Sequence, residues 1–538
     1  MRTKFFAFVA MCLFAVSSAF GQSRTVTGQV ISGSDNEPLI GVAILVQGTS
    51  NGTATDLDGN FKLENVPANA TLVVSYMGFT TQEVKATPNM KITLQEDTEL
   101  LNEVVVIGYG VQKKSDLTGA VGSVDEKSLK ALSTTDAAAA LQGKVAGVNI
   151  ITDGAPGAAA EIRIRGISSN GGNISPLYIV DGLQVNSIQY LDPSMIESME
   201  ILKDGASAAI YGAEAGNGVV LITTKQGQTG KATVNYTGKF TNQNFRKRPL
   251  MNREQLIEYV GLEYIDDPKY MSSRIQDYDF NHPLYDNGVI DTDWIGAYIE
   301  PTWSQQHSLS LSGGNNQGHF FTSLNFVNNN GAVKGDRDVY KRFTAQVNAD
   351  YQLFKWLQVG TTNSIEKYET KSVSQRGYSS SFESVINLEP LTPTNFTDPS
   401  QMPNDFRNAY DAYMNGTSNK RVFFDEDGYP LAAPMYSDVE GNPLAKILAS
   451  DGTNEGFNVN GTFFANLTPV KGLTITSRFG YRISQNTSHN FTAPYYIGRG
   501  SQDNYSISAN ANTGYYYQWE NFANYNITIT MIKTNTIN

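Results

Sequence analysis

The residues best suited to bind a metal ion or to transfer a proton are four histidines, His282, His307, His319 and His489. No two of them have the spacing of a His-Glu-x-x-His zinc site, and all four fall in loops or at strand ends. The chain also has no Gly-x-Ser-x-Gly elbow and no phosphate-binding P-loop. We therefore expect no catalytic residues, no metal site and no cofactor, and we predict that the protein is not an enzyme.

Two short motifs partly match ligand-binding loops. Gly108-Tyr109-Gly110 follows an apolar run, as in a dinucleotide-binding fingerprint, but Lys113 occupies the third glycine position. The stretch TDLDGNF suggests a calcium loop. Counted from Asp56, however, the glycine is fourth rather than sixth and the twelfth residue is Pro67 rather than glutamate. We interpret this second motif as a turn between two strands.

Arg163 and Arg165 alternate with Ile162 and Ile164, which is the period-two pattern of a strand. Two arginines on one face of a sheet could hold an anionic ligand. They could also pair with carboxylates of the same sheet, which is the commoner arrangement. The sequence leaves both interpretations open.

These residues belong to segments of different character. Residues 22–97 contain short strand-like runs, such as TVTGQVI and ATLVVSYMGF, separated by Gly, Pro, Asn and Asp, which is typical of a β-sandwich. Residues 115–228 mix helix and strand. There, STTDAAAALQGKVAGV has the start and stop signals of a short helix, and PLYIVDGLQV predicts a hairpin turned by Asp181-Gly182. The stretch from Pro193 to Lys225 predicts the order helix, strand, helix, strand.

Residues 229–538 contain long runs in which apolar and polar side chains alternate. In KRFTAQVNADY, Phe343, Val347 and Tyr351 belong to one apolar face, and FNVNGTFFANLTPVKGLTITSRFGYRI has two such arms around a turn at residues 468–472. Each arm is about ten residues long, the length that a tilted strand needs to cross a bilayer. Roughly eight strands, with short turns at one end and long polar connections at the other, predict an incomplete antiparallel transmembrane β-barrel. The longest connection runs from about residue 370 to 455.

The N-terminus and the composition indicate an exported, mainly β protein. Residues 1–21 have the basic start, apolar run and small residues of a secretory signal peptide. The one cysteine, Cys12, lies in that segment, so the exported part cannot use disulfides. Charged residues are only 17% and aromatic residues 11%, as in β-rich proteins with wet, tyrosine-lined surfaces. The net charge of -12 argues against a nucleic-acid partner.

Taken in order, several strings resemble the SusC/RagA-type TonB-dependent outer-membrane receptors. VTGQVISGSDNEPLIGVAILVQGT and GTATDLDGNFKL resemble their carboxypeptidase-regulatory-like domain, and LNEVVVIGYG resembles their TonB-box region. LQGKVAGVNI, IRIRG, PLYIVDG and IESMEILKDGASAAIYGAEAGNGVVLITTK resemble the plug, and DTDW and HSLSLSGG resemble the start of the barrel. The resemblance implies a regulatory-like sandwich at 22–97, a TonB-box linker at 98–114, a plug at 115–228 and a partial barrel with long extracellular loops at 229–538.

For function, the resemblance implies import of a nutrient, a glycan or an oligopeptide, across the outer membrane of a Gram-negative cell. Outer-membrane lipid surrounds the barrel of such a receptor, and the N-terminal domain and plug face the periplasm. A SusD-like surface lipoprotein covers the binding site. The TonB-ExbB-ExbD complex pulls on the TonB box and opens a path through the plug.

An extended, unpaired strand can join the sheet of a partner through main-chain hydrogen bonds, and β-branched residues suit that state. We therefore expect TonB to contact Glu103, Val104, Val105, Val106 and Ile107. Gly108 and Gly110 are expected to form a hinge between this strand and the plug, because glycine leaves the backbone free to turn.

Several questions stay open at this point. Receptors of this type are about twice as long, with barrels of about 22 strands, so we expect this chain to be the front part of a receptor, truncated or frameshifted.

The alternative function is a secreted or surface β-rich module for glycan binding or adhesion. A signalling role would need an extra N-terminal domain, which no stretch resembles. The tyrosines and asparagines of the 370–455 connection suit stacking on sugars, and they equally suit an ordinary wet loop.

Overall fold

The computed structural model describes residues 23–33, 37–49, 51–67, 69–76, 79–95, 104–107, 110–113, 121–130, 134–167, 170, 172, 174–247, 249–266, 290–373, 381–434, 441–498 and 501–526. The chain divides into two compact units. One comprises Met1–Val106 and Val111–Thr118, and the other comprises Ile107–Gly110 and Gly119–Asn538. The expected signal peptide, residues 1–21, lies outside the described residues.

The first unit consists of two small sheets that share one apolar core. The sheets have the strand orders β4-β1-β7 and β3-β2-β5-β6. The strands are β1 (Ser23–Ser32), β2 (Ala43–Val46), β3 (Gly52–Ala54), β4 (Asn60–Pro67), β5 (Thr71–Ser75), β6 (Gln82–Lys85) and β7 (Asn89–Leu94). Alternate side chains of both sheets point inward, and the core they form includes Val30, Ile44, Leu63, Leu72 and Ile92. The predicted β-sandwich is therefore confirmed.

The TDLDGNF stretch forms the turn between β3 and β4. Oδ1 of Asp56 accepts hydrogen bonds from the backbone N–H of Asp58 at 3.0 Å and of Asn60 at 2.8 Å. The N–H of Asp56 in turn donates to the carbonyl of Asn60 at 2.9 Å. The carboxylate thus stabilises its own turn, as the sequence predicts.

The second unit begins with a mixed sheet of order β10-β15-β16-β13-β14 and a separate hairpin of β11 and β12. The strands are β10 (Val121–Asp125), β11 (Val148–Ile151), β12 (Glu161–Ile164), β13 (Leu177–Val180), β14 (Leu183–Val185), β15 (Ile196–Leu202) and β16 (Val219–Thr224). The helices are α3 (Glu126–Lys130) and α4 (Gly205–Ala208), with the 3-10 helices η3 (Ala139–Leu141), η4 (Pro193–Met195), η5 (Ala209–Tyr211) and η6 (Ala213–Asn217). Ile162, Met199, Ile201 and Val220 pack in its core. We call residues 121–228 the plug.

The hairpin and the alternating elements of the plug match the prediction. Asp181 and Gly182 have φ values of +48° and +82° and join β13 to β14, as a two-residue type I′ turn requires. The order η4, β15, α4 to η6 and β16 corresponds to the predicted helix, strand, helix, strand.

Strand β12 settles the interpretation of one of the two arginines. Ile162 and Ile164 are buried on one side of the strand. On the other side, Nε of Arg163 lies 2.8 Å from the carboxylate of Glu161, so the interpretation as an ion pair within the sheet is confirmed for this arginine. Arg165 follows the end of the strand and has a φ of +58°.

The helix predicted within residues 133–148 is reduced to a single 3-10 turn, η3. The carboxylate of Asp136 accepts hydrogen bonds from the N–H of Ala138 at 2.8 Å and of Ala160 at 2.7 Å, which ties the segment to the chain just before β12. Gly143 then takes a φ of +71°, and helical backbone cannot continue through that conformation. The predicted short helix is therefore present only as η3, because a tertiary contact and an early stop limit the alanine run.

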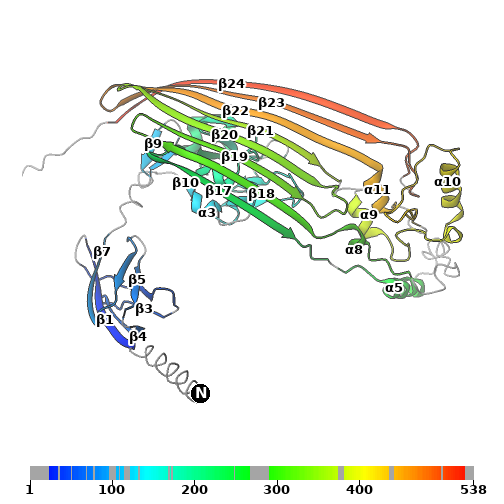
Figure 1. The fold of residues 1–538 in the computed structure, drawn as a ribbon, viewed down its shortest axis with the longest axis horizontal. Coiled ribbons are helices and arrows are strands. Elements are labelled where there is room, and N and C mark those ends of the chain that lie inside the picture. Colours follow the sequence, from blue (N-terminus) through cyan, green and yellow to red (C-terminus); the bar gives the residue numbers. More distant parts are fainter. Residues whose placement is uncertain are drawn as a thin grey trace, which may run out of the picture. The chain divides into compact units, whose positions relative to one another are not determined.

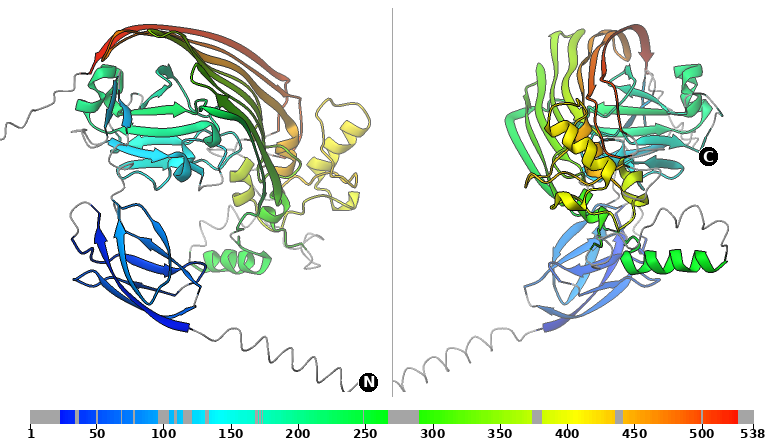
Figure 2. Two further views of the ribbon diagram at one scale, coloured as in Figure 1. Left: turned by 60° about the vertical axis from the view of Figure 1, so that its left-hand side comes forward. Right: turned by 90° about the vertical axis from the view of Figure 1, so that its right-hand side faces the viewer.

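Residues from Gly230 onward form one antiparallel sheet of eight strands, which we call the wall (Figure 1). The strands pair in chain order and are β17 (Gly230–Gln243), β18 (Thr302–Gly314), β19 (Gly318–Asn330), β20 (Val339–Phe354), β21 (Leu357–Lys371), β22 (Ser450–Val470), β23 (Leu473–Thr492) and β24 (Ser506–Tyr525). The sheet curves over the plug (Figure 2). Within the described residues it is not closed, since β17 and β24 are its two edges. The predicted antiparallel sheet is confirmed.

The wall strands are longer than the predicted ten residues. β18 has 13 residues and β22 has 21. The ladder of β22 and β23 stays paired up to Val470 and Leu473, with a shift of register around Pro469. The turn predicted at residues 468–472 is therefore only Lys471 and Gly472. The predicted strands were too short, because polar residues at the strand ends also pair with the neighbouring strands.

Short turns lie at one end of the wall, and the long connections at the other end contain helices. These are α5 (Arg253–Asp266), α8 (Trp294–Tyr298), α9 (Ser381–Asn387), α10 (Asn404–Met414) and α11 (Pro443–Ala449), with the 3-10 helix η8 (Pro399–Gln401). The connection between β21 and β22 supplies most of an apolar cluster, in which Phe396, Met402 and Phe406 are buried and against which Tyr410 and Tyr413 pack. These two tyrosines belong to a folded connection and not to a fully wet one. A role for this connection in binding sugars stays a prediction.

Within the described residues, no helix combines the length and the apolar character that crossing a membrane would need.

Candidate functional site

The two faces of the wall carry opposite kinds of side chain. On β20, Thr344, Gln346 and Asn348 are at most 3% exposed, whereas Phe343 and Val347, which alternate with them, are 46% and 47% exposed. In most soluble proteins the apolar set would be the buried one. Buried polar groups need hydrogen-bond partners, and the plug supplies them.

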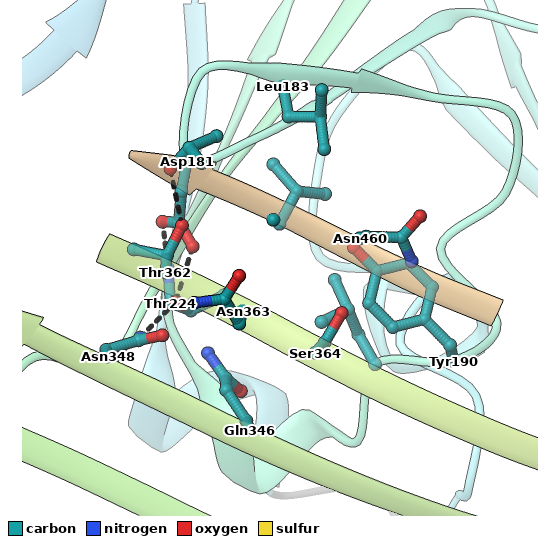
Figure 3. A pocket seen from close by; sticks show the side chains of 14 residues that line it. Asp181, Leu183, Tyr190, Thr224, Gln346, Asn348, Thr362, Asn363, Ser364 and Asn460 are labelled. Atoms are coloured by element: carbon teal, nitrogen blue, oxygen red, sulfur yellow. Dashed lines mark hydrogen bonds between the residues drawn. The ribbon is translucent and has the colours of Figure 1, made fainter. Parts of the chain in front are cut away.

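A buried polar cluster, made of Asp181, Thr224 and Asn348, joins the plug to the wall (Figure 3). The carboxylate of Asp181 accepts a hydrogen bond from Oγ1 of Thr224 at 2.6 Å and another from the Thr224 N–H at 2.9 Å. Asn348 donates from Nδ2 to Oγ1 of Thr224 at 2.8 Å and to the carbonyl of Lys225 at 2.7 Å. The cluster thus connects the hairpin turn, the end of β16 and a wall strand.

The Asp181 carboxyl is buried, and this burial raises its pKa because desolvation disfavours the charged form. The hydrogen bonds from Thr224 and the positive charge of Arg478 act in the opposite direction. The carboxyl of Asp181 therefore takes up a proton more readily in the folded plug than in the unfolded chain.

Further polar contacts hold the plug at other wall strands. Nη2 of Arg342 donates to the carbonyl of Thr135 at 3.1 Å, and Nη1 donates to the carbonyl of Gln189. The hydroxyls of Ser194, in η4, and Ser308, on β18, lie 2.9 Å apart. Contacts of this kind can exchange with water one by one, without exposing an apolar core.

A small cavity of about 20 Å³ lies beside the buried polar cluster (Figure 3). It is lined by Val180, Asp181, Leu183, Tyr190, Leu191, Thr224, Gln346, Asn348, Thr362, Asn363, Ser364, Asn460, Gly461 and Thr462. Oε1 of Gln346 and Oδ1 of Asn348 are buried and accept no hydrogen bond from the described residues. The size and polarity of this cavity suit a single water molecule, not a nutrient.

A larger cavity, which we call the plug-wall cavity, has a volume of about 450 Å³. It is lined by Val185, Asn186, Ser187, Gln189 and Tyr190 of the plug and by Glu366, Tyr368, Asn458, Asn460, Arg482, Ser484, Asn486, Gly514, Tyr515 and Tyr516 of the wall. Most of these side chains are amides, hydroxyls or tyrosines, and Arg482 and Glu366 are the charged ones. Its volume falls in the range of small-molecule sites, and its lining suits a polar ligand.

The residues predicted to contact TonB include a strand, β8 (Val104–Ile107), which pairs with β9 (Gly110–Lys113) in a two-stranded sheet. The expectation that these residues form a strand is confirmed. The expectation that this strand is unpaired was wrong, because β9 begins two residues later and pairs with it. Gly110 is the first residue of β9. Glu103 and Gly108 lie outside the described residues. The contact with TonB and the hinge at Gly108 and Gly110 stay predictions.

His307 and His319 contact neighbouring polar and aromatic side chains. Nδ1 of His319 lies 3.2 Å from the carboxylate of Asp350, and the Tyr236 hydroxyl lies 2.8 Å from Nδ1 of His307. His282 lies outside the described residues. In the part of the chain that the structure describes, no three His, Cys, Asp or Glu side chains are grouped so that they could hold a metal ion.

The sequence did not single out Thr224, Asn348 and Arg482, which join the plug to the wall. A signal for Asn348 was present, because the alternation in KRFTAQVNADY puts it on the face opposite Phe343. Its partner Thr224 lies 124 residues away in the chain, and no local pattern relates positions that far apart.

Two family models match the chain. The CarboxypepD_reg-like domain matches residues 26–106, and the TonB-dependent receptor plug domain matches residues 113–219.

Curated relatives extend the match to most of the chain. TonB-dependent receptor P39 of Formosa agariphila is 35% identical over 531 residues, which are 97% of this chain and 46% of that protein. TonB-dependent receptor SusC of Bacteroides thetaiotaomicron is 37% identical over 354 residues, which are 64% of this chain and 34% of SusC. The chain thus spans less than half the length of these relatives.

Among solved structures, the RagAB peptide importer in its open-open state is similar to this chain, with a TM-score of 0.60 and 25% sequence identity. The match covers 80% of this chain and 47% of the importer chain. The two domain models, the relatives and the shared fold together show that the chain belongs to the SusC/RagA-type TonB-dependent receptors.

Proposed function

We propose that this chain carries the plug and the first wall strands of a receptor that imports a polar nutrient across the outer membrane. The observation that supports the proposal most directly is the inverted wall. Its polar side chains are buried on the plug side, and its large apolar side chains, such as Val234, Phe343 and Val347, are exposed on the other side. An exposed apolar face of this kind suits contact with lipid.

In this proposal the nutrient binds in the plug-wall cavity, and transport requires the plug to loosen. The plug is held to the wall by separate polar contacts, which include the buried polar cluster and the pair Ser194 and Ser308. TonB, as part of the TonB-ExbB-ExbD complex, pulls on the segment Glu103–Ile107. Because β8 already pairs with β9, TonB adds a strand at the other edge of β8 or takes the place of β9.

The nutrient is a glycan or an oligopeptide, and a SusD-like lipoprotein covers the end of the wall that carries the long connections. The similarity to SusC and to the RagAB peptide importer supports this part of the proposal. The lining of the plug-wall cavity, rich in amides and tyrosines, supports a polar ligand. The alternative function, a secreted adhesion module, does not explain why the apolar face of the wall is exposed.

Substitution of Val105 by proline tests the role of the TonB segment. Proline removes one backbone donor and disfavours pairing with a second strand. We expect Val105→Pro to abolish energised uptake of the nutrient by cells that produce the receptor, while binding of the nutrient at the cell surface persists. Val105→Thr keeps both the donor and the β-branched side chain, so it serves as the matched control and should transport normally. Normal uptake by the proline variant would show that this segment is not the TonB contact.

A further inference from the structure

Arg482 is a partly buried cation on β23 that faces the plug-wall cavity. Its Nη1 donates to the carbonyl of Gln184 at 3.1 Å and to Oδ1 of Asn186 at 2.9 Å, both in the plug. The guanidinium also lies over the ring of Tyr516, 4.5 Å from its centroid. No described residue accepts a hydrogen bond from Nε or Nη2, and no described carboxylate forms a salt bridge with Arg482.

The absence of a carboxylate partner distinguishes Arg482 from a nearby arginine on the same strand. Arg478, four residues earlier, lies 3.7 Å from the carboxylate of Glu520 and packs over Phe522. A partly buried charge without a counter-charge is costly, and proteins usually pair such a group or use it to bind a ligand. The planar guanidinium is suited to hold a carboxylate with two parallel hydrogen bonds.

The other charged residue of the cavity does not take that role. Glu366 is 4% exposed, and its Oε2 accepts a hydrogen bond from Nδ2 of Asn458 at 2.7 Å. The carboxylate of Glu366 is thus held within the wall, and Arg482 remains available to a ligand in the cavity.

We propose that Arg482 recognises a carboxylate group of the ligand in the plug-wall cavity, with Tyr516 beside it to contact the rest of the ligand. This rests on the proposed function, because it names the chemistry of the imported nutrient. The carboxylate belongs to an acidic sugar or to the C-terminus of a peptide. Both sources present the same group to the guanidinium.

The same arginine links the ligand to the plug. Nη1 donates to the backbone of Gln184, in β14, and to the side chain of Asn186, the residue after that strand. Tyr516, under the guanidinium, donates from its hydroxyl to Oε1 of Gln184 at 3.3 Å. A ligand carboxylate that draws the guanidinium toward the cavity therefore weakens the hold of the wall on the hairpin of β13 and β14.

Binding to the full chain in detergent, followed by calorimetry, tests the recognition of a carboxylate. The probes are a glucuronosyl-glucose disaccharide against neutral cellobiose, and the peptide Gly-Tyr-Gly against its C-terminal amide. We expect the carboxylate probe of one pair to bind more tightly than its neutral counterpart, and that pair identifies the source of the carboxylate. Arg482→Gln should weaken binding of that probe by about 10- to 100-fold and leave the neutral probe unchanged.

Two further variants separate recognition from folding. Arg482→Lys retains the charge and should restore part of the preference for the carboxylate. Arg478→Gln removes a cation from the same strand that does not line the cavity, and it should leave the preference intact. The proposal is overturned if neither carboxylate probe binds more tightly than its neutral counterpart, or if Arg478→Gln removes the preference as fully as Arg482→Gln does.

Hydrogen exchange at Val185 and Asn186 tests the link to the plug. We expect the preferred carboxylate probe to speed exchange at these two amides in the wild-type chain and to leave it unchanged in Arg482→Gln. Equal exchange with and without the probe would contradict the link. These binding and exchange measurements need no TonB. A negative result in them would contradict only the role of Arg482, whereas normal uptake by the Val105→Pro variant would contradict the proposed energised transport.

Discussion

Asn348 shows how single residues fix the plug against the wall. Its side chain is fully buried on β20, and its amide donates to both Thr224 and the Lys225 carbonyl. A buried hydrogen bond contributes little net stability while it is intact, but loss of one partner leaves the other group desolvated and unpaired. The cost of disrupting the buried polar cluster should therefore exceed that of deleting an exposed apolar group from the same strand.

We predict that Asn348→Ala lowers the free energy of unfolding of the plug by about 1–3 kcal/mol, because the Lys225 carbonyl and Oγ1 of Thr224 lose a donor. Urea titration followed by hydrogen exchange in β16 measures this change. Val347→Ala is the matched control, since it removes an exposed side chain from the other face of β20. Equal effects of the two substitutions would show that the cluster does not stabilise the plug.

The raised pKa of Asp181 leads us to expect that the stability of the plug depends on pH. Its pKa in the folded plug is raised, so between the ordinary value of aspartate and the raised value the folded state binds more protons than the unfolded chain. The contribution of Asp181 to stability is therefore most favourable at acid pH and is lost as the pH rises through the folded pKa. We expect Asp181→Asn to become more stable relative to wild type as the pH rises toward neutral, as measured by urea titration at several pH values. A constant difference at all pH values would contradict the raised pKa.

At the scale of elements, the alternation along each wall strand sorts the side chains between plug and exterior. Substitution of Val347 by lysine places a charge on the exposed apolar face, near the middle of β20. We expect Val347→Lys to lower the stability of the wall in the membrane by about 2–4 kcal/mol and to reduce the amount of receptor in the outer-membrane fraction. Val347→Thr, which is β-branched and uncharged, should have a much smaller effect. Normal assembly of the lysine variant would mean that this face does not contact lipid.

The elements that the sequence predicted well are those with a local cause. The Asp181-Gly182 turn, the turn at Asp56 and the alternating wall strands follow from backbone preferences and period-two patterns within a few residues. The short helix predicted within residues 133–148 is only the 3-10 turn η3, because Asp136 bonds to Ala160, 24 residues along the chain. The cluster of Thr224 and Asn348 and the contacts of Arg482 with Gln184 likewise depend on pairs separated by more than a hundred residues.

At the scale of the whole molecule, the central proposal is that the plug must loosen from the wall for import. Residues 121–228 form two sheets that share no strand with the wall, and polar side chains of the wall hold them. The only cysteine of the chain is Cys12, in the expected signal peptide. Introduced cysteine pairs would therefore meet no competing thiol in the exported protein.

The most direct measurement is nutrient uptake by cells whose receptor carries Ser194→Cys together with Ser308→Cys. The two hydroxyls lie 2.9 Å apart, so the thiols should form a disulfide that fixes the plug to β18 under oxidising conditions. We predict that the oxidised double variant binds the nutrient but does not import it, that a reductant restores import, and that each single variant transports normally. Full uptake while the disulfide remains intact would contradict the proposal that the plug must leave its place on the wall.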